Sequence, residues 1–374
     1  MQPVVQLLAD LVRIPSMNPM GRTCTGREYT EEPIARFVAG YLRDRGIAAE
    51  LQDVGPHRLN VLAHIDAGAE HTLLLEAHLD TVQADAMLVP PFDARIVGGR
   101  MQGRGACDTK GSLAAFMDAV CSLVAEHKTL RYNVVLAAVA DEEYQFTGAR
   151  LAVAAGMRAN FGICGEPTRL HIITAHKGVT RWRIRTSGRA AHSAYPARGK
   201  NAIYAMGRVL AAVEQHAGEL TRRVPHPSLG TPTMSVGVIE GGTAVNIVPD
   251  RCSIEIDRRT LPGEGREAIV GDLERALSGI DGWSMDAPHL EAAGMEVPEG
   301  CPEVDLLRRE IEAVAGSAVV ESAHYATDAG IYFAAGIPCI VFGPGDIADA
   351  HTATESLDID ELLLAREIVR RFLI

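Results

Sequence analysis

The segment TLLLEAHLDTV, residues 72–82, ends a run of apolar residues with His78 and Asp80. Two residues apart on an extended backbone, these side chains point to the same side of a strand. A carboxylate behind an imidazole can fix the tautomer that binds a metal ion. Read alone, the pair also fits a hydrogen-bonded histidine at the polar end of a strand.

Three adjacent acidic residues, Asp141, Glu142 and Glu143, follow the apolar run NVVLAAVA at residues 133–140. Carboxylates this close at the end of a buried strand repel one another unless positive charge lies among them, and a metal ion would supply that charge. Because adjacent residues can point to opposite sides, one glutamate can be a ligand and its neighbour a general base. A solvated acidic loop is the alternative.

Three more potential ligands stand in separate loops. Asp108 lies in GRGACDTKGS, just before an amphipathic helix that it could also cap; Glu166 follows the apolar run FGIC; His351 lies after CIVFGPG. Together with His78 and one of the two adjacent glutamates, they give two histidines and three carboxylates. These are the ligand types expected for zinc, or for two divalent metal ions that share an aspartate.

The elements around these residues predict an α/β domain. From residue 1 to about 177, helical patterns alternate with short apolar strand patterns, which is typical of a mainly parallel sheet covered by helices. Ligands of such sheets bind at the carboxyl ends of the strands. The five polar loops are therefore expected to meet at one edge of the sheet.

Residues 178–291 have a different pattern, with elements in the order βαββαβ. This order predicts a ferredoxin-like α+β domain inserted into the first one. The α/β alternation resumes at about residue 292, so residues 1–177 and 292–374 are expected to form one catalytic domain. Within the insertion, residues 244–260 and residues 283–293 are each expected to form one strand.

Composition narrows the function classes. With 374 residues, 47% of them hydrophobic, the chain is long enough for two folded domains. A net charge of −12 argues against a nucleic-acid partner, and no apolar run approaches the roughly 20 residues that span a bilayer. The seven cysteines form no Cys-x-x-Cys pair and the N-terminus has no basic leader, so we expect a cytoplasmic protein.

Six motifs occur in the order typical of the M20 metallopeptidase family: HLDTV, GRGACDTKG, DEE, GEPT, AHS and AHTATE. The chain resembles this family over essentially its whole length. The resemblance implies a zinc-peptidase-like catalytic domain with an inserted lid and dimerisation domain. It also implies a homodimer through that domain, and two Zn²⁺ ions per subunit that Co²⁺ can replace.

The resemblance also implies residue roles. The ligands of one zinc would be His78, Asp108 and Glu166, and those of the other would be Asp108, Glu143 and His351. Glu142 would be the general base, and Asp80 would orient His78. His192, in AHS, would stabilise the oxyanion, often across a dimer interface.

The substrate contacts implied by the resemblance are Asn246, Arg258 and Thr327. Arg258 suits a substrate carboxylate because its guanidinium binds such groups through two hydrogen bonds. Arg259 is the alternative candidate for this contact, since alternation along a strand directs only one of the two side chains inward. No role is assigned to Lys177.

The implied reaction is hydrolysis of the amide bond of a small N-acyl amino acid. The motifs GEPT, AHKG, YPARGKNAI and LPGE are most similar to the acetylornithine deacetylase branch of the family. Desuccinylase, aminoacylase and M20 carboxypeptidase or dipeptidase activities are the alternatives. A non-catalytic protein that binds metal or amino acid is a distant one, because such a relic could lose the base, whereas Glu142 is present.

Overall fold

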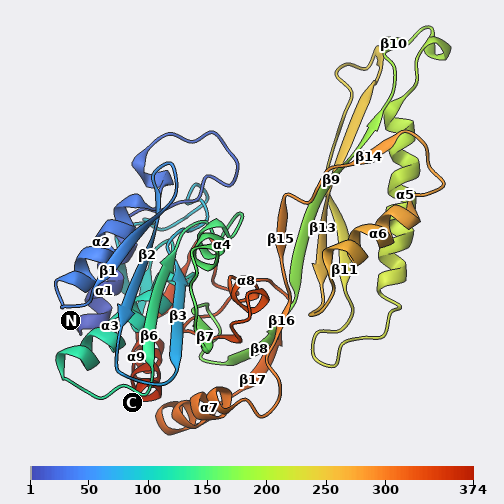
Figure 1. Ribbon diagram of the computed structural model, residues 1–374. Coiled ribbons are helices and arrows are strands. Elements are labelled where there is room, and N and C mark those ends of the chain that lie inside the picture. The colour runs from blue at the N-terminus through green and yellow to red at the C-terminus, as the bar shows by residue number, and fades with distance from the viewer. Residues whose placement is uncertain (1) are drawn as a thin grey trace. The chain divides into compact units, whose positions relative to one another are not determined.

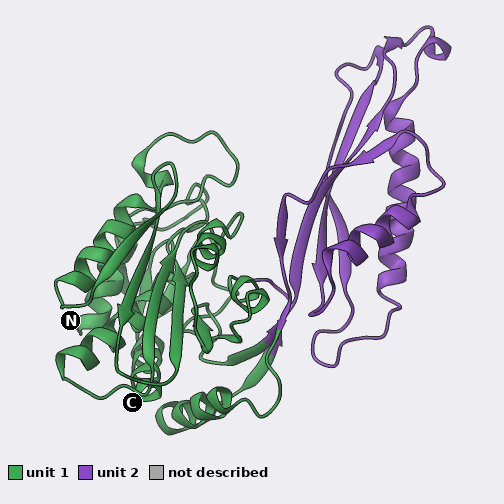
Figure 2. Cartoon of the chain, viewed as in Figure 1, with its two compact units in different colours: residues 1–174, 296–321, 327–374 green, residues 175–295, 322–326 purple. Residues whose placement is uncertain are grey.

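The computed structural model describes residues 2–374, which divide into two compact units (Figure 2). Unit 1 comprises the chain up to residue 174 together with residues 296–321 and 327–374, and unit 2 comprises residues 175–295 and 322–326. The junctions expected after residues 177 and 291 lie three and four residues from those found. The return of residues 322–326 to unit 2 was not expected.

The central sheet of the described chain has nine strands, in the order β1-β2-β6-β3-β7-β18-β8-β16 with β17 beside β8. The four middle strands β6, β3, β7 and β18 are parallel, whereas β1, β2 and β8 pair antiparallel. The α/β class with a mainly parallel centre is thus confirmed. The strands are β1 (Ala49–Gly55), β2 (Arg58–Ile65), β3 (Thr72–His78), β6 (Asn133–Val139), β7 (Phe161–Cys164), β8 (Ile172–His176), β16 (Met295–Glu296), β17 (Val320–Ala323) and β18 (Cys339–Val341).

Helices cover this sheet. The side chains of α1, α2, α3, α7 and α9 pack into one apolar core with the sheet, while α4 and α8 contact other parts of it (Figure 1). Their apolar spacing explains the packing, and Pro3 stands at the first turn of α1, where its missing N–H costs nothing. The helices are α1 (Pro3–Val12), α2 (Glu32–Arg43), α3 (Lys110–Ala125), α4 (Thr147–Ala154), α7 (Pro302–Ala315), α8 (Ala329–Ala334) and α9 (Ile359–Leu373).

Alternation along β3 decides which side chains face this core. Leu73, Leu75 and Ala77 belong to the apolar cluster. Because successive side chains on a strand point to opposite faces, Glu76 and His78 point away from that cluster. His78 is nevertheless buried, so its ring nitrogens need partners on the other face.

The strand register brings the ends of the parallel strands to one edge. His78 pairs with Val139 across β3 and β6, Glu76 pairs with Cys164 across β3 and β7, and Val341 pairs with Cys164 across β18 and β7. The loops after these four strands therefore start side by side. The predicted ligand loops share this edge because of the parallel register.

Short elements complete unit 1. A small sheet in the order β19-β5-β4 lies next to the loop that ends with Glu355. None of the helices in residues 2–374 is long and apolar enough to cross a lipid bilayer. The remaining elements are η1 (Arg27–Tyr29), β4 (Arg95–Val97), β5 (Arg100–Gln102) and β19 (Ser356–Asp358).

Unit 2 has an antiparallel sheet in the order β11-β13-β9-β14, with β15 also beside β9. Helices α5 and α6 pack on it, and their order with these strands is βαββαβ. The elements are β9 (Gly178–Ser187), β10 (Ala191–His192), η2 (Pro196–Arg198), α5 (Ala202–Leu220), β11 (Thr233–Gly241), β12 (Ile247–Val248), β13 (Arg251–Thr260), α6 (Arg266–Ala276), β14 (Trp283–Met285) and β15 (Leu290–Ala292).

Two expected strands of unit 2 are each divided in two. Residues 244–260 form β12 and β13, which are separated at Pro249 and Asp250, and residues 283–293 form β14 and β15, which are separated around Pro288. Proline has no N–H to donate to a strand partner, so each ladder stops there. The expectation of single strands was wrong because it did not take into account that these prolines interrupt strand pairing.

Candidate metal centre

His78, at the end of β3, has both ring nitrogens engaged. Its Nδ1 lies 2.9 Å from the main-chain oxygen of Asp80, which can only accept, so Nδ1 carries the proton of the neutral ring. Its Nε2 lies 3.0 Å from Asp108 Oδ1 and 3.8 Å from Glu166 Oε1. The ring is therefore oriented with Nε2 toward two carboxylates, as a metal-binding histidine requires.

The carboxylate of Asp80 has other partners than the one expected. Its nearest oxygen lies 3.8 Å from His78 Nδ1, beyond hydrogen-bonding distance. Instead, the main-chain N–H groups of Glu142 and Glu143 donate to its two oxygens at 3.1 and 3.2 Å. Asp80 thus orients the histidine through its main-chain carbonyl, because the backbone turns at the strand end. Its side chain fixes the loop of the two glutamates.

Asp108 lies between the two histidines. Its Oδ1 is 3.0 Å from His78 Nε2, and its Oδ2 is 3.1 Å from His351 Nε2. The same nitrogen of His351 is 3.2 Å from Glu143 Oε1. Each oxygen of one carboxylate therefore faces a different histidine, which is the arrangement needed for a ligand that bridges two metal ions.

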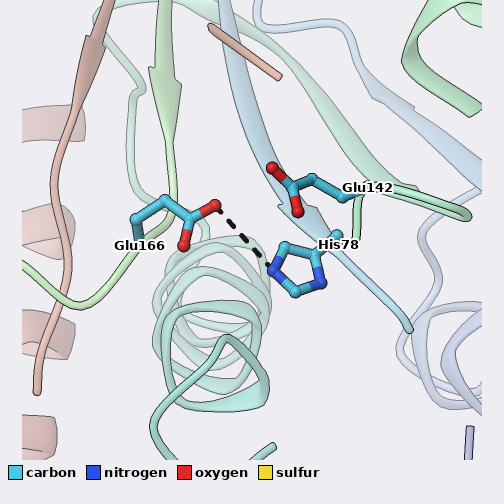
Figure 3. Close-up of side chains that lie close together, drawn as sticks. All are labelled: His78, Glu142 and Glu166. Atoms are coloured by element: carbon cyan, nitrogen blue, oxygen red, sulfur yellow. Dashed lines mark ion pairs between the residues drawn. The ribbon is translucent and has the colours of Figure 1, made fainter. Parts of the chain in front are cut away.

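Glu142 and Glu166 approach His78 from the loops after β6 and β7 (Figure 3). Ligand atoms of these three residues lie within 4.8 Å of one another, and those of His78, Asp108 and Glu143 form a second such group. His78 belongs to both groups, so the two sets of oxygens adjoin at its ring.

Buried negative charge dominates this site. Burial raises the pKa of Glu142, Glu143 and Glu166, and in each case a neighbouring carboxylate raises it further. Hydrogen bonds to Asp108 and Glu143 raise the pKa of His351 to about 10. These carboxylates and inward-facing nitrogens fit divalent cations, which would compensate the charge that one edge of the sheet concentrates here.

Asn18 belongs to this region but was not predicted from the sequence. Its Nδ2 donates to Asp80 and to Asp141, both at 2.8 Å, and it is fully buried. Arg58 donates to the same oxygen of Asp141 at 2.8 Å. Asn18 precedes its partners by 62 and 123 residues, and no local pattern marks it.

The chain matches the family described as peptidase family M20/M25/M40 over residues 74–374. It belongs to that family. Among its relatives, an acetylornithine deacetylase from Myxococcus xanthus is 33% identical over 354 residues, which cover 91% of this chain and 90% of that protein. The acetylornithine deacetylase from Klebsiella pneumoniae (strain 342) is 32% identical over 379 residues, which cover 98% of this chain and 96% of that protein.

Solved structures of M20 proteins share the fold. The M20 family metallo-carboxypeptidase Sso-CP2 from Sulfolobus solfataricus aligns with a TM-score of 0.81 and 20% identity, over 100% of this chain and 98% of that one. The YXEP protein from Bacillus subtilis is described as a dinuclear metal-binding peptidase from the M20 family. It aligns with a TM-score of 0.72 and 17% identity, over 99% of this chain and 96% of that one. This M20 chain is a metal-dependent hydrolase that acts on amides.

In unit 2 of this M20 protein, His192 and Asn246 are neighbours. Strand β10 pairs with β12 so that His192 lies opposite Ile247, and the Ser193 N–H donates to the Asn246 main-chain oxygen at 3.0 Å. Both side chains are exposed. Two residues more than fifty positions apart therefore occupy one small hairpin-like region of unit 2.

Arg258 is the inward-facing member of the arginine pair on β13. It is 2% exposed, and it donates to Glu264 Oε1 at 2.9 Å and to the Arg259 main-chain oxygen at 2.7 Å. Arg259 instead pairs with Asp257. Arg258 thus already has an acidic partner, which any substrate carboxylate would have to share or displace.

Thr327 and Lys177 are buried. Thr327 lies in the turn before α8, where its Oγ1 accepts the Ala329 N–H at 3.2 Å. Lys177 donates from Nζ to the Thr231 main-chain oxygen at 2.6 Å, within unit 2. Neither contact by itself indicates a substrate.

Proposed function

We propose that this M20 protein hydrolyses the amide bond of a small N-acyl amino acid, with an N-acetylated ornithine as the favoured substrate, using two Zn²⁺ ions. The observation that supports it most is Asp108, whose two oxygens each face a different histidine at 3.0 and 3.1 Å. The relatives named acetylornithine deacetylase support the substrate, at 31–33% identity over at least 91% of this chain.

In this proposal, five residues hold the metal pair. His78 and Glu166 would hold the first ion, Glu143 and His351 would hold the second, and Asp108 would be shared by both. Bound in this way, the ions supply positive charge that polarises the substrate carbonyl and lowers the pKa of a water molecule. Cobalt, which prefers similar ligands, is expected to substitute for zinc.

Glu142 is the proposed general base. Its carboxylate lies within 4.8 Å of the ligand atoms of His78 and Glu166. It would take a proton from the attacking water and deliver it to the leaving amine, which is the nitrogen of the free amino acid. The Asp80 carboxylate keeps Glu142 in place through the Glu142 main-chain N–H.

Unit 2 supplies the proposed substrate contacts and the dimer interface. His192 would donate a hydrogen bond to the oxyanion, and Asn246 and Arg258 would contact the amino-acid part, together with Thr327 of unit 1. The edge strand β11 exposes Val238 and Ile239, at 45% and 55%, which supports pairing with a second copy through this unit. Analytical ultracentrifugation tests the dimer, and a monomer at micromolar concentration would exclude it.

The cysteines support a reducing compartment. All seven, from Cys24 to Cys339, are free thiols, and five of them are buried. We therefore propose a cytoplasmic location. Because deacylation there releases a free amino acid, a role in amino-acid biosynthesis fits the same proposal.

A substrate panel tests the acyl group. Enzyme loaded with Zn²⁺ or Co²⁺ is assayed with N-acetylornithine, N-succinyl-diaminopimelate, other N-acyl amino acids and dipeptides, and amine release is measured. The expected result is the highest kcat/KM for N-acetylornithine. Hydrolysis of dipeptides alone would replace the deacetylase proposal by a dipeptidase one.

Two neighbouring variants test the division of roles. Glu142→Gln should lower kcat by at least about 100-fold with metal content unchanged, since it removes only the base. Glu143→Ala should lower both activity and metal content, which is measured by atomic absorption. Equal metal loss in the two variants would contradict the roles proposed for these glutamates.

A further inference from the structure

Glu355 has more hydrogen-bond donors around it than other carboxylates near the metal centre. It lies four residues after His351 and is fully buried. Its Oε1 accepts the main-chain N–H groups of Gly105 and Cys107 at 3.0 Å and that of Asp108 at 3.1 Å. One side chain from the His351 loop therefore binds the loop that contains Asp108.

The backbone of the Asp108 loop is shaped for this contact. Gly105 has a φ of +84°, and a Cβ there would come within 2.7 Å of Thr81 Cγ2. A residue with left-handed backbone dihedral angles next to residues with right-handed ones turns the neighbouring main-chain N–H groups toward one point. These N–H groups form a concave site for an anion. The Glu355 carboxylate is the anion that occupies it.

The second oxygen of Glu355 is held from the other side. Arg104 Nη1 donates to Oε2, and both side chains are almost completely buried. Arg104 also donates to the Gln83 main-chain oxygen at 3.2 Å. The Gly103 N–H donates to the Glu355 main-chain oxygen at 3.1 Å, so the backbones of the two loops are joined as well. Four donors on two oxygens leave the carboxylate one orientation.

We propose that Glu355 is a positioning residue that fixes Asp108 and His351 relative to each other. This proposal rests on the proposed metal centre, in which Asp108 and His351 are both ligands of the second ion. The Glu355 carboxylate accepts hydrogen bonds from Arg104 and from the main chain of the Asp108 loop. It acts through the Asp108 main chain on one side and through its own loop on the other, so it sets the distance between a bridging ligand and a terminal one.

The test uses metal-depleted full-length enzyme, titrated with Zn²⁺ against a competing chelator. Wild type should bind two ions in two steps. In Glu355→Gln, one amide group replaces one oxygen, so either the three N–H groups or Arg104 lose their acceptor. The weaker step should lose affinity by about 10- to 100-fold, the range typical of residues behind a ligand.

A matched control separates positioning from general stability. Asp118 is another largely buried carboxylate of unit 1, paired with Arg366 at 2.8 Å and away from the ligand loops. Asp118→Asn should lower Tm without changing either Zn²⁺ affinity. The visible absorption of the Co²⁺-loaded enzyme should change in Glu355→Gln but not in Asp118→Asn, because it reports ligand geometry.

The outcomes distinguish the two proposals. Absence of Zn²⁺ binding by wild type would overturn the metal centre itself. Two intact steps in wild type with the same affinities in Glu355→Gln would overturn only the role of Glu355. If Glu355→Gln does not fold, Glu355→Asp is titrated instead. It keeps the charge but is one methylene too short to reach both sets of donors, and unchanged affinities there would overturn the role equally.

Discussion

At the scale of single residues, the site depends on groups that the sequence pattern does not reveal. The types and strand-end positions of His78 and Glu166 were enough to predict that they would meet. The partner of the Asp80 carboxylate was not predictable, because it depends on how the backbone turns after two different strands. Asn18 and Glu355 were missed for a related reason: their partners are more than 60 and more than 240 residues away in sequence.

Asn18 offers a test at this scale. Asn18→Asp replaces an amide that donates to Asp80 and Asp141 by a third carboxylate, so these groups should repel one another and loosen the Glu142 loop. We expect kcat to fall by at least about 10-fold with KM nearly unchanged, in line with a misplaced base. Steady-state kinetics at saturating Zn²⁺ measure this.

Asn133 provides the control for Asn18. It also donates its amide, to the Ala69 main-chain oxygen at 2.8 Å, but it lies at the opposite end of β6 from the site. Asn133→Asp should reduce stability and leave kcat unchanged. An equal loss of kcat in both variants would mean that Asn18 acts only through stability.

At the scale of elements, long apolar or strongly periodic segments were predictable. The run TLLLEAH coincides with β3, and the closing helix, expected at residues 358–374, is α9 at Ile359–Leu373. The hairpin of β1 and β2 was not predicted, because AELQDVG has too few apolar residues to indicate a strand. Its position is set by pairing with β6, which is a tertiary interaction.

The start of α9 gives a prediction for one element. Asp358 Oδ1 accepts the N–H groups of Asp360 at 2.8 Å and Glu361 at 3.3 Å, so it caps the helix. Asp358→Ala should lower the free energy of unfolding by about 1 kcal/mol, whereas Asp358→Asn, which can still accept these bonds, should lose less. Urea denaturation measures both, and equal losses would contradict the capping role.

At the scale of the whole molecule, stability should depend on pH through a buried histidine. His176, at the end of β8, is fully buried with Nδ1 2.9 Å from the Lys177 main-chain oxygen. Burial lowers the pKa of His176 from 6.5 to about 4. Between pH 6.5 and about 4, His176 is therefore protonated in the unfolded chain but neutral in the folded protein. The free energy of unfolding falls as the pH falls through this range.

The size of this effect can be measured with one variant. Between pH 6.5 and pH 4, His176 should remove up to roughly 3 kcal/mol from the free energy of unfolding. His176→Gln should flatten the pH dependence of Tm by the corresponding amount. Comparison at pH 8, where the histidine is neutral in both states, gives the packing loss separately. An unchanged slope in the variant would exclude His176 as the source.

The interruption of unit 1 by unit 2 also has a consequence for biosynthesis. Of the five proposed ligands, His78, Asp108, Glu143 and Glu166 precede residue 175, and His351 follows residue 295. On the ribosome, the first four emerge before the inserted unit, and the fifth emerges after it. In the proposed centre, the ligands of the first ion are therefore all synthesised before the inserted unit, whereas the second ion would gain its last ligand, His351, only after the entire inserted unit has been synthesised.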